Sequence, residues 1–325
     1  MRDVIATTVY YIISILLFPV SLLGYAIWVG KGFLMGNPSG VSVTAQGPLS
    51  ARWAMHNLGT RQDEPANRLM PLLPGVPPVA SRMVSFPTLL AHRVTGYVPK
   101  AFRYPFEGDV PKQYEASARV TFFDEAVDRY LAEINQFVIL GAGFDTRPYR
   151  FPKDRRVRSF EVDAPKTQAV KRAMLAKAGI DSSAVTFVAA DFEQEDWLAR
   201  LVDSGFDLAK PALFLWEGVM VYLEREAVED TLRKIASTAK SSVVAFDYFT
   251  TEPAESNALY WRYGRAATRA AGEPFKFGID STPPTRERVS ELLQSCGLTL
   301  REQRTLGRET ENERAWGGFA VASVG

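Results

Sequence analysis

The sequence is poor in the residues that build disulfide frameworks and metal sites. Its 325 residues include one cysteine, Cys296, and two histidines, His56 and His92. A single cysteine excludes a disulfide within the chain and fits a reducing compartment. The two histidines lie far apart in the sequence, and no cysteine pair joins them, so no metal site is expected.

The chain also lacks an excess of charge of either sign. Lysine and arginine number 38 and aspartate and glutamate 37, which gives a net charge of +1. Bulk electrostatic attraction to nucleic acid is therefore absent, and no nucleic-acid partner is expected. The length allows one or two domains with a sizeable core. The oligomeric state cannot be inferred from these features.

Charged residues are missing altogether from residues 4–29. Such a run is long enough to cross a bilayer core, which takes about 20 apolar residues. Aromatic side chains lie toward both ends, as they do at membrane interfaces: Tyr10, Tyr11, Tyr25 and Trp28. We therefore expect residues 1–30 to form a transmembrane helix that anchors the protein.

Basic residues beyond this run favour a cytoplasmic location for its C-terminal side and for the remaining protein. Lys31, Arg52 and Arg61 outweigh Arg2, which Asp3 offsets. Three other interpretations of the run stay open. It could be a cleaved signal segment, a buried core helix, or a hairpin that bends at Pro19 and Gly24 and enters one leaflet only.

Residues 31–112 have the composition of a linker followed by a proline-rich cap. Residues 30–47 are rich in glycine, serine and proline, and prolines recur as far as Pro111. We expect short helices at most there, for example over 50–58 and 86–94. Four aromatic residues would either line an apolar substrate pocket or pack the segment on the core: Tyr97, Phe102, Tyr104 and Phe106.

From residue 136 onward, short apolar runs alternate with helical patterns. The predicted strands are 136–140, 157–162, 185–190 and 212–216, and a fifth spans 242–248. Helical spacing fills the intervals, for example over 165–178. This alternation is typical of an α/β protein with a parallel sheet.

The first of these strands runs into Gly141 and Gly143, a pattern of tight turns that approach a ligand. A dinucleotide fingerprint needs a third glycine where this chain has Thr146, which disfavours NAD. The next strands end in acidic residues, at Asp163, Asp191 and Glu217. Carboxylates suit a ligand with a ribose, an adenine amino group and an ammonium. S-adenosylmethionine has all three, and it has no phosphate.

Four motifs in this order resemble the leucine carboxyl methyltransferase family. They are Leu140-Gly-Ala-Gly-Phe-Asp-Thr146, Phe160-Glu-Val-Asp-Ala-Pro165, Ala190-Asp-Phe192 and Glu217-Gly-Val-Met-Val-Tyr-Leu223. The resemblance runs from about Ala116 to the C-terminus. It implies a methyltransferase domain over 113–325, with the class I, Rossmann-like seven-stranded sheet and a helical cap. The last strands, 298–305 and 316–324, would form the antiparallel edge of that sheet.

The resemblance also implies roles for particular residues. Arg119 would hold the methionine carboxylate of S-adenosylmethionine, a role that suits a planar guanidinium. By spacing alone, Arg119 would be a solvated arginine on a helix. The other cofactor-binding residues would be Gly141 and Gly143 (close backbone approach), Asp163 (ribose), Asp191 with Phe192 (adenine) and Glu217 (ammonium).

These features together predict an S-adenosylmethionine-dependent O-methyltransferase that acts on a small, lipid-like or polyketide-type acceptor. No histidine lies near the core motifs, which fits a carboxylate acceptor because a carboxylate needs no general base. A hydroxyl acceptor stays open, with Asp145, Glu217, Tyr222 or His92 as the base. A membrane-tethered binding or regulatory protein without methyl-transfer activity is the alternative from another class. No catalytic residue is assigned from the sequence.

Overall fold

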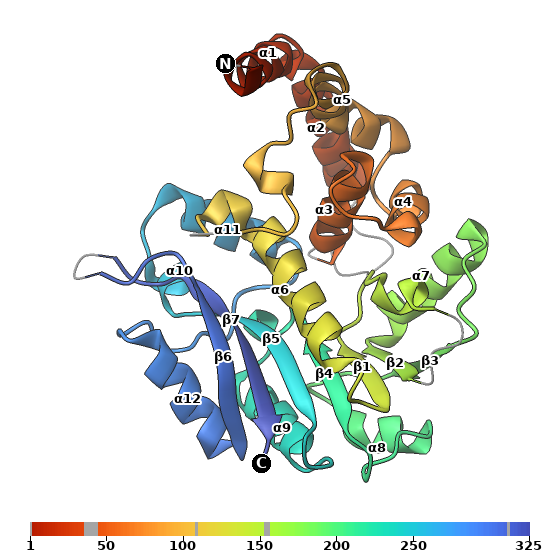
Figure 1. The fold of residues 1–325 in the computed structure, drawn as a ribbon, viewed down its shortest axis with the longest axis vertical. Coiled ribbons are helices and arrows are strands. Elements are labelled where there is room, and N and C mark those ends of the chain that lie inside the picture. Colours follow the sequence, from red (N-terminus) through yellow and green to blue (C-terminus); the bar gives the residue numbers. More distant parts are fainter. Residues whose placement is uncertain (1, 36–44, 108–109, 153–156, 311–312) are drawn as a thin grey trace.

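The computed structural model describes residues 2–35, 45–107, 110–152, 157–310 and 313–325. Figure 1 shows a twisted sheet with helices on both faces, and an N-terminal group of helices stacked beyond one face. Residues 36–44, which form much of the predicted linker, lie outside the described residues.

The sheet has seven strands in the order β3-β2-β1-β4-β5-β7-β6. Strands β1 to β5 pair in parallel, whereas β7 pairs antiparallel with both β5 and β6. The bounds are β1 (Gln136–Leu140), β2 (Arg158–Asp163), β3 (Val185–Ala189), β4 (Ala212–Trp216), β5 (Val243–Phe249), β6 (Leu298–Leu306) and β7 (Gly317–Val324). The predicted α/β fold, a mixed seven-stranded sheet of the class I methyltransferase type, is confirmed.

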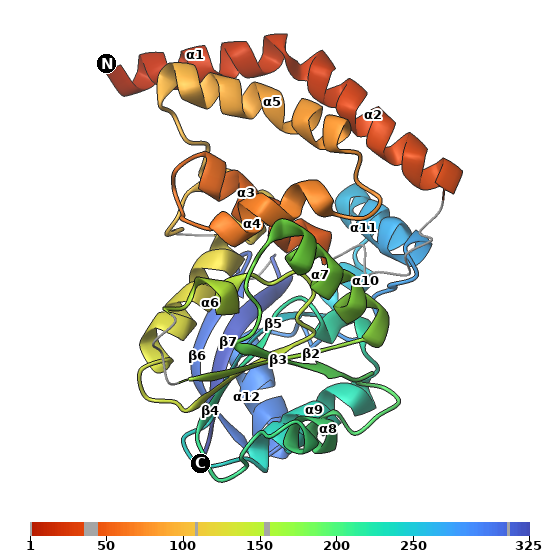
Figure 2. The same cartoon turned by 90° about the vertical axis from the view of Figure 1, so that its right-hand side faces the viewer.

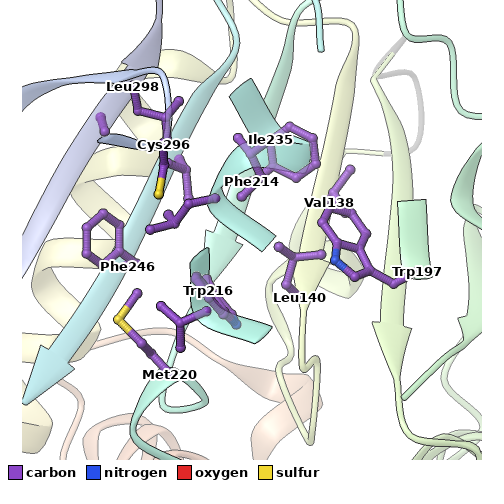
Figure 3. Close-up of a cluster of buried hydrophobic side chains, with 14 of the residues drawn as sticks. Val138, Leu140, Trp197, Phe214, Trp216, Met220, Ile235, Phe246, Cys296 and Leu298 are labelled. Carbon is purple, nitrogen blue, oxygen red and sulfur yellow. The ribbon is translucent and has the colours of Figure 1, made fainter. Parts of the chain in front are cut away.

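Helices cover both faces of the sheet, because its central strands are apolar on both sides. All five residues of β1 and all five of β4 are buried, as expected for parallel strands between two helical layers. Helices α6 (Glu115–Tyr130) and α7 (Pro165–Ala178) lie on one face. Helices α8 (Trp197–Asp203), α9 (Arg225–Ala236) and α12 (Thr285–Ser295) lie on the other. Figure 3 shows the apolar core between the sheet and α8, α9 and α12, in which Trp197, Phe214 and Trp216 pack around Leu140.

The cap comprises N-terminal helices and an insertion after β5. Helix α3 (Gln46–Asn57) contacts α6 and helix α4 (Glu64–Leu69) contacts α7, and Leu49, Leu69 and Leu175 belong to one buried apolar cluster. The insertion holds α10 (Glu252–Glu255) and α11 (Leu259–Ala270). Short 3₁₀ helices occupy Met70–Leu72, Lys100–Phe102, Lys112–Tyr114, Arg147–Arg150 and Met220–Tyr222.

One cap helix is longer than the sequence predicts. Helix α5 spans Pro78–Thr95, although Pro87 interrupts its interior. A proline removes one backbone hydrogen bond and crowds the preceding turn. Packing along α1 and α2 stabilises α5 despite this loss (Figure 2). Proline content alone therefore predicted too little helix in this segment.

The predicted single transmembrane helix over residues 1–30 is wrong in form. Two helices occupy the region, α1 (Arg2–Leu16) and α2 (Phe18–Met35), with an angle of 50° between them at Leu17. Pro19 lacks the backbone N–H that would continue the hydrogen bonds of α1, which accounts for the break. No single helix in the described residues is long and apolar enough to span a membrane. The bent pair passes that test, by length and composition only.

Candidate functional site

A cavity of about 360 Å³ opens at the carboxyl ends of β1 to β5. In a parallel α/β sheet this edge is where ligands bind, because the loops after successive strands converge there. All seven residues predicted to bind the cofactor line this cavity: Arg119, Gly141, Gly143, Asp163, Asp191, Phe192 and Glu217. They come from α6 and four different strand ends. The structure thus brings them together, while the role of each stays a prediction.

The turn after β1 can be built only with glycine. Gly141 has φ +65° and Gly143 has φ +44°, both in the left-handed region. A Cβ atom on Gly141 would lie 2.3 Å from Cγ2 of Val219. The first glycine therefore lets the backbone approach the loop after β4 closely.

Asp163 at the end of β2 is held by two backbone donors. Its Oδ2 accepts from the N–H of Gly143 at 2.5 Å, and its Oδ1 accepts from the N–H of Ala164 at 2.7 Å. Burial raises the pKa of Asp163 to about 6, and the two N–H groups counteract part of that rise. A desolvated carboxylate facing a cavity is suited to accept hydrogen bonds from hydroxyl groups.

After β3, the backbone turns at Asp191 and Phe192. Oδ1 of Asp191 accepts from the N–H of Glu193 at 2.9 Å, and the N–H of Asp191 donates to Oε2 of Glu195 at 3.0 Å. Phe192 lies against Trp197, with ring centroids 6.1 Å apart. The loop thus offers the cavity one carboxylate and one aromatic side chain.

Glu217 after β4 has one carboxylate oxygen in use and one free of protein partners. Its Oε2 accepts from Nη2 of Arg52 at 2.9 Å and from Nη1 of Arg147 at 2.7 Å. Its Oε1 is buried and has no hydrogen-bond partner among the residues that the structure describes. A buried carboxylate oxygen is costly to leave unpaired, so this atom fits a cationic donor such as an ammonium.

Asp145 shares both arginines with Glu217. Oδ2 of Asp145 lies 3.1 Å from Nη2 of Arg52 and also pairs with Arg147. Burial alone would raise the pKa of Asp145, but Arg147 and Arg52 outweigh it and hold the pKa below the ordinary value. Asp145 is therefore a weak base in this setting.

Arg119 reaches the same cavity from α6. Its Nη2 pairs with Oδ2 of Asp247 in β5 at 3.0 Å and also with Glu115. Its Nε is buried and has no hydrogen-bond partner in the described part of the chain. Oδ1 of Asp247 accepts from the N–H of Gly218 at 2.6 Å. Burial raises the pKa of Asp247 to about 6, although Arg119 lowers it in part.

Further buried ion pairs lie behind those that Arg52 and Arg147 form with Asp145 and Glu217. Asp124 of α6 pairs with Nε of Arg61 at 2.7 Å and with Nε of Arg147 at 2.8 Å. Arg61 also pairs with Asp63, whose Oδ2 accepts from the hydroxyl of Thr146 at 2.7 Å. The position that would carry a third glycine in a dinucleotide site is thus a structural hydrogen-bond donor here.

Three of the four candidate bases, Asp145, Glu217 and Tyr222, line the cavity, whereas His92 and the aromatic residues proposed for an acceptor pocket do not. Neither histidine lines the cavity: Nδ1 of His56 accepts from the N–H of Asp63, and Nδ1 of His92 lies 3.1 Å from the carbonyl oxygen of Tyr97. The aromatic residues at 97–106 do not line it either. Tyr97 packs on Tyr10, and Tyr104 donates to Asp124, so the packing interpretation of that segment is favoured.

Sequence reasoning missed Arg52, which is 1% exposed and brings the cap into the cavity. A signal for it existed in the helical spacing of Leu49, Arg52 and Met55, all three buried on one side of α3. An arginine on the apolar stripe of a helix needs a buried carboxylate partner. The identity of that partner, 165 residues away, is not legible in the sequence.

Residues 108–236 match the model of the leucine carboxyl methyltransferase family. The chain is 34% identical over 175 residues to a putative S-adenosyl-L-methionine-dependent methyltransferase of Mycolicibacterium smegmatis, covering 53% of each chain. It is 36% identical over 133 residues to one of Saccharopolyspora erythraea, covering 40% of this chain and 46% of that protein. The chain thus spans about half the length of the curated relatives it matches. The resemblance inferred from the four motifs is confirmed.

Among solved structures, the mitomycin 7-O-methyltransferase MmcR is similar at a TM-score of 0.42 and 15% identity. The match covers 66% of this chain and 56% of that one.

Proposed function

We propose that this chain transfers the methyl group of S-adenosylmethionine to a carboxylate oxygen of a small acceptor. The observation that carries the proposal is the carboxylate of Glu217, a residue that lines the cavity and whose buried Oε1 has no hydrogen-bond partner among the described residues. The curated relatives, named as S-adenosyl-L-methionine-dependent methyltransferases, support the same cofactor.

Each end of the cofactor finds a complementary group in the cavity. Oε1 of Glu217 would accept from the ammonium, and the Asp163 carboxylate would accept from the ribose hydroxyls. Asp191 and Phe192 would hold the adenine, with Phe192 against its face. Arg119 would face the methionine carboxylate with its unpaired Nε.

When bound, S-adenosylmethionine supplies an electrophilic methyl group on a sulfonium, and its carbon–sulfur bond breaks as the bond to the acceptor oxygen forms. The chain's contribution is then to align the acceptor oxygen behind that bond and to exclude water, because proximity and orientation can supply much of the rate enhancement.

A carboxylate acceptor fits the state of Asp145 and Glu217, two of the three candidate bases that line the cavity; the third is Tyr222. Asp145 is held ionised by Arg147 and Arg52, which makes it a poor base. Glu217 is engaged by the same two arginines. Neither histidine reaches the cavity. A carboxylate is already ionised at neutral pH and needs none of these groups.

The remainder of the acceptor would be apolar. The loop after β4 and the end of β5 give the cavity Val219, Met220, Val221 and Phe249. Binding sites of this kind use apolar walls for affinity and a few polar groups for orientation. A small or lipid-like carboxylic acid therefore suits the site. Because its methyl donor is made in the cytosol, the domain would work on the cytoplasmic side of a membrane.

The test uses purified full-length protein, S-adenosylmethionine with a labelled methyl group, and matched sets of carboxylic acids and phenols. A methyl ester releases labelled methanol in base, whereas a methyl ether does not. We expect base-labile label with apolar carboxylic acids. Base-stable label would show a hydroxyl acceptor instead. Cofactor binding without transfer to any member of either set would favour a binding or regulatory protein.

A further inference from the structure

The outward side of the α1–α2 pair is apolar along its whole length. Its exposed residues recur at helical spacing, with relative exposures from 39% at Ile27 to 73% at Leu16. We call this the outer face; it consists of Val4, Ile5, Tyr11, Ile12, Ile15, Leu16, Phe18, Leu22, Leu23 and Ile27. Asp3 is the only charged residue among residues 3–28 of the pair, and its side chain is exposed.

The opposite side of the pair is fixed against α5, so the outer face cannot turn inward. Tyr10 is buried, and a Cβ atom on Gly24 would lie 2.7 Å from Cβ of Met83. The hydroxyl of Ser21 donates to the backbone carbonyl of Val84 at 2.8 Å. Figure 2 shows α5 running alongside both helices, with the pair as the outermost layer of the molecule.

Helix α11 extends the same apolar surface. The hydroxyl groups of Tyr25 in α2 and Tyr263 in α11 lie 3.3 Å apart. Within the described residues, every exposed large hydrophobic side chain except Leu208 belongs to α1, α2, α5 or α11. Exposed large apolar side chains that are concentrated on neighbouring helices indicate an interaction site.

Positive charge accompanies this surface. Arg82 and Arg93 of α5, and Arg262 and Arg269 of α11, are exposed. No carboxylate in the described part of the chain forms a salt bridge with any of the four. Exposed arginines beside an apolar face complement anionic lipid headgroups, which attract basic residues near a bilayer.

We propose that α1, α2, α5 and α11 form a platform that docks on the surface of an anionic lipid bilayer. The outer face inserts among the headgroups and upper acyl chains while the helices lie in the plane of the membrane. This inference is independent of the proposed methyl transfer. It replaces the transmembrane anchor expected from the sequence with a one-sided attachment.

Two features favour lying on the bilayer over crossing it. The 50° bend divides the apolar run into two short helices. In addition, α5 packs along both of them, so a crossing would carry Arg82 and Arg93 into the hydrocarbon core, where charged side chains are costly. The scarcity of polar groups on the outer face disfavours a protein partner, because protein interfaces carry about one hydrogen bond per 100–200 Å².

Flotation of the full-length protein with preformed vesicles of phosphatidylcholine and phosphatidylglycerol tests the proposal. The variant Ile15→Glu with Leu22→Glu places two charges on the outer face and should lower the partition coefficient at least about tenfold. Leu208→Glu, at an exposed leucine away from the platform, is the matched control and should not change it. All three proteins should bind S-adenosylmethionine alike, which separates this test from that of the proposed function.

The charge contribution is tested separately. Arg82→Gln with Arg93→Gln should weaken binding to anionic vesicles by about fivefold for each arginine, and leave binding to pure phosphatidylcholine unchanged. Wild-type protein that does not float with anionic vesicles overturns the proposal. So does a wild-type dimer that Ile15→Glu with Leu22→Glu dissociates while no lipid binding is seen, because the outer face would then join two copies.

Depth of insertion distinguishes docking from crossing. Cys296 is buried, so a dye can be attached selectively to an Ile15→Cys variant at the middle of the pair. Docking predicts stronger quenching by lipids with a quencher near the headgroup than by lipids with one at the bilayer centre. The reverse order would show that the pair crosses the bilayer and would overturn the one-sided arrangement.

Discussion

Nη2 of Arg52 and Oε2 of Glu217 lie 2.9 Å apart in an ion pair that joins the N-terminal cap to the tip of β4. Both side chains are almost fully buried, and the same guanidinium also contacts Asp145. The contact holds Oε2 of Glu217 and leaves Oε1 without a hydrogen-bond partner among the described residues. The cap therefore forms part of the cavity wall.

Removing this guanidinium should damage both stability and binding. Arg52→Ala leaves Glu217 and Asp145 with Arg147 as their shared partner, and breaking a buried pair costs about 3–5 kcal/mol. Thermal unfolding and titration with S-adenosylmethionine would show a lower melting temperature and weaker binding. Arg286→Ala, at an exposed arginine of α12, should change neither. Equal behaviour of the two variants would mean that Arg52 does not support the cavity.

The sheet could be predicted from the sequence because each strand and crossover helix is marked by residues within or next to it. The apolar runs that become β1 and β4 are buried on both faces, and α7 begins at Pro165 and ends before Gly179, which are ordinary helix boundary signals. The acidic residues at strand ends could likewise be placed at one edge, because parallel strands put their carboxyl ends together.

The cap could not be predicted in the same way. The role of Arg52 follows from its ion pairs with Glu217 and Asp145, and these partners are distant in the sequence. Helix α5 extends through Pro87 because tertiary packing outweighs the local preference. The break at Leu17 depends on Pro19, yet Gly24, which looks equally disruptive, is a packing position against Met83.

Asp163 should be the main determinant of ribose binding. Asp163→Ala removes a charge-assisted contact to two hydroxyl groups, and we expect cofactor binding to weaken by about 2–4 kcal/mol with the fold intact. Calorimetric titration measures the change. Asp203→Ala, at an exposed aspartate that ends α8, serves as the control and should leave affinity unchanged.

The same residue should make binding depend on pH. Burial raises the pKa of Asp163 to about 6, and ribose hydroxyls favour its ionised form. Affinity should therefore be constant above this pKa and fall as the pH drops through it, by up to about tenfold per pH unit. Asp163→Asn should flatten the profile, leaving only the contribution of Asp247, whose pKa is also about 6. An unchanged profile in that variant would exclude Asp163 from the site.

The stability of the ligand-free fold should depend on pH in the opposite direction from the affinity. A carboxyl group whose folded pKa exceeds its unfolded value contributes stability below the unfolded pKa, and that contribution is lost as the pH rises through about 6. Ligand binding, which favours the ionised form, should therefore stabilise the protein more at neutral than at acidic pH.

Arg119 should require its planar geometry. Arg119→Lys keeps the charge but loses the forked donors that pair with carboxylates, so affinity for S-adenosylmethionine should fall more than tenfold, about 1.4 kcal/mol or greater. Titration at constant ionic strength measures it. Arg129→Lys, at an exposed arginine of the same helix, is the control. Wild-type affinity in Arg119→Lys would reduce Arg119 to a structural partner of Asp247.

Asp124 should matter for stability through two buried arginines. Asp124→Asn leaves Arg61 and Arg147 short of a countercharge, which should destabilise the fold by about 3–5 kcal/mol. Asp128→Asn, at an exposed position of the same helix, should stay within about 0.5 kcal/mol of wild type. Denaturant unfolding compares them, and similar midpoints would show that the ion pairs of Asp124 add nothing.

Burial would raise the pKa of Asp124, but Arg147 and Arg61 hold it far below its ordinary value. Its stabilising effect should therefore be present at neutral pH and disappear in acid, below the pKa of the unfolded chain. The destabilisation caused by Asp124→Asn should shrink in the same acidic range.

The free oxygen of Glu217 is tested most directly by titrating wild type and Glu217→Gln with S-adenosylmethionine and with an analogue that lacks the amino group. The expected result is that wild type binds the cofactor at least about tenfold more tightly than the analogue, a difference of about 1.4 kcal/mol, and that Glu217→Gln abolishes the preference. Melting curves identify any loss of fold in the variant. Absence of heat with wild type at about 1 mM cofactor, or an equal preference in both proteins, would contradict the assignment of the cavity.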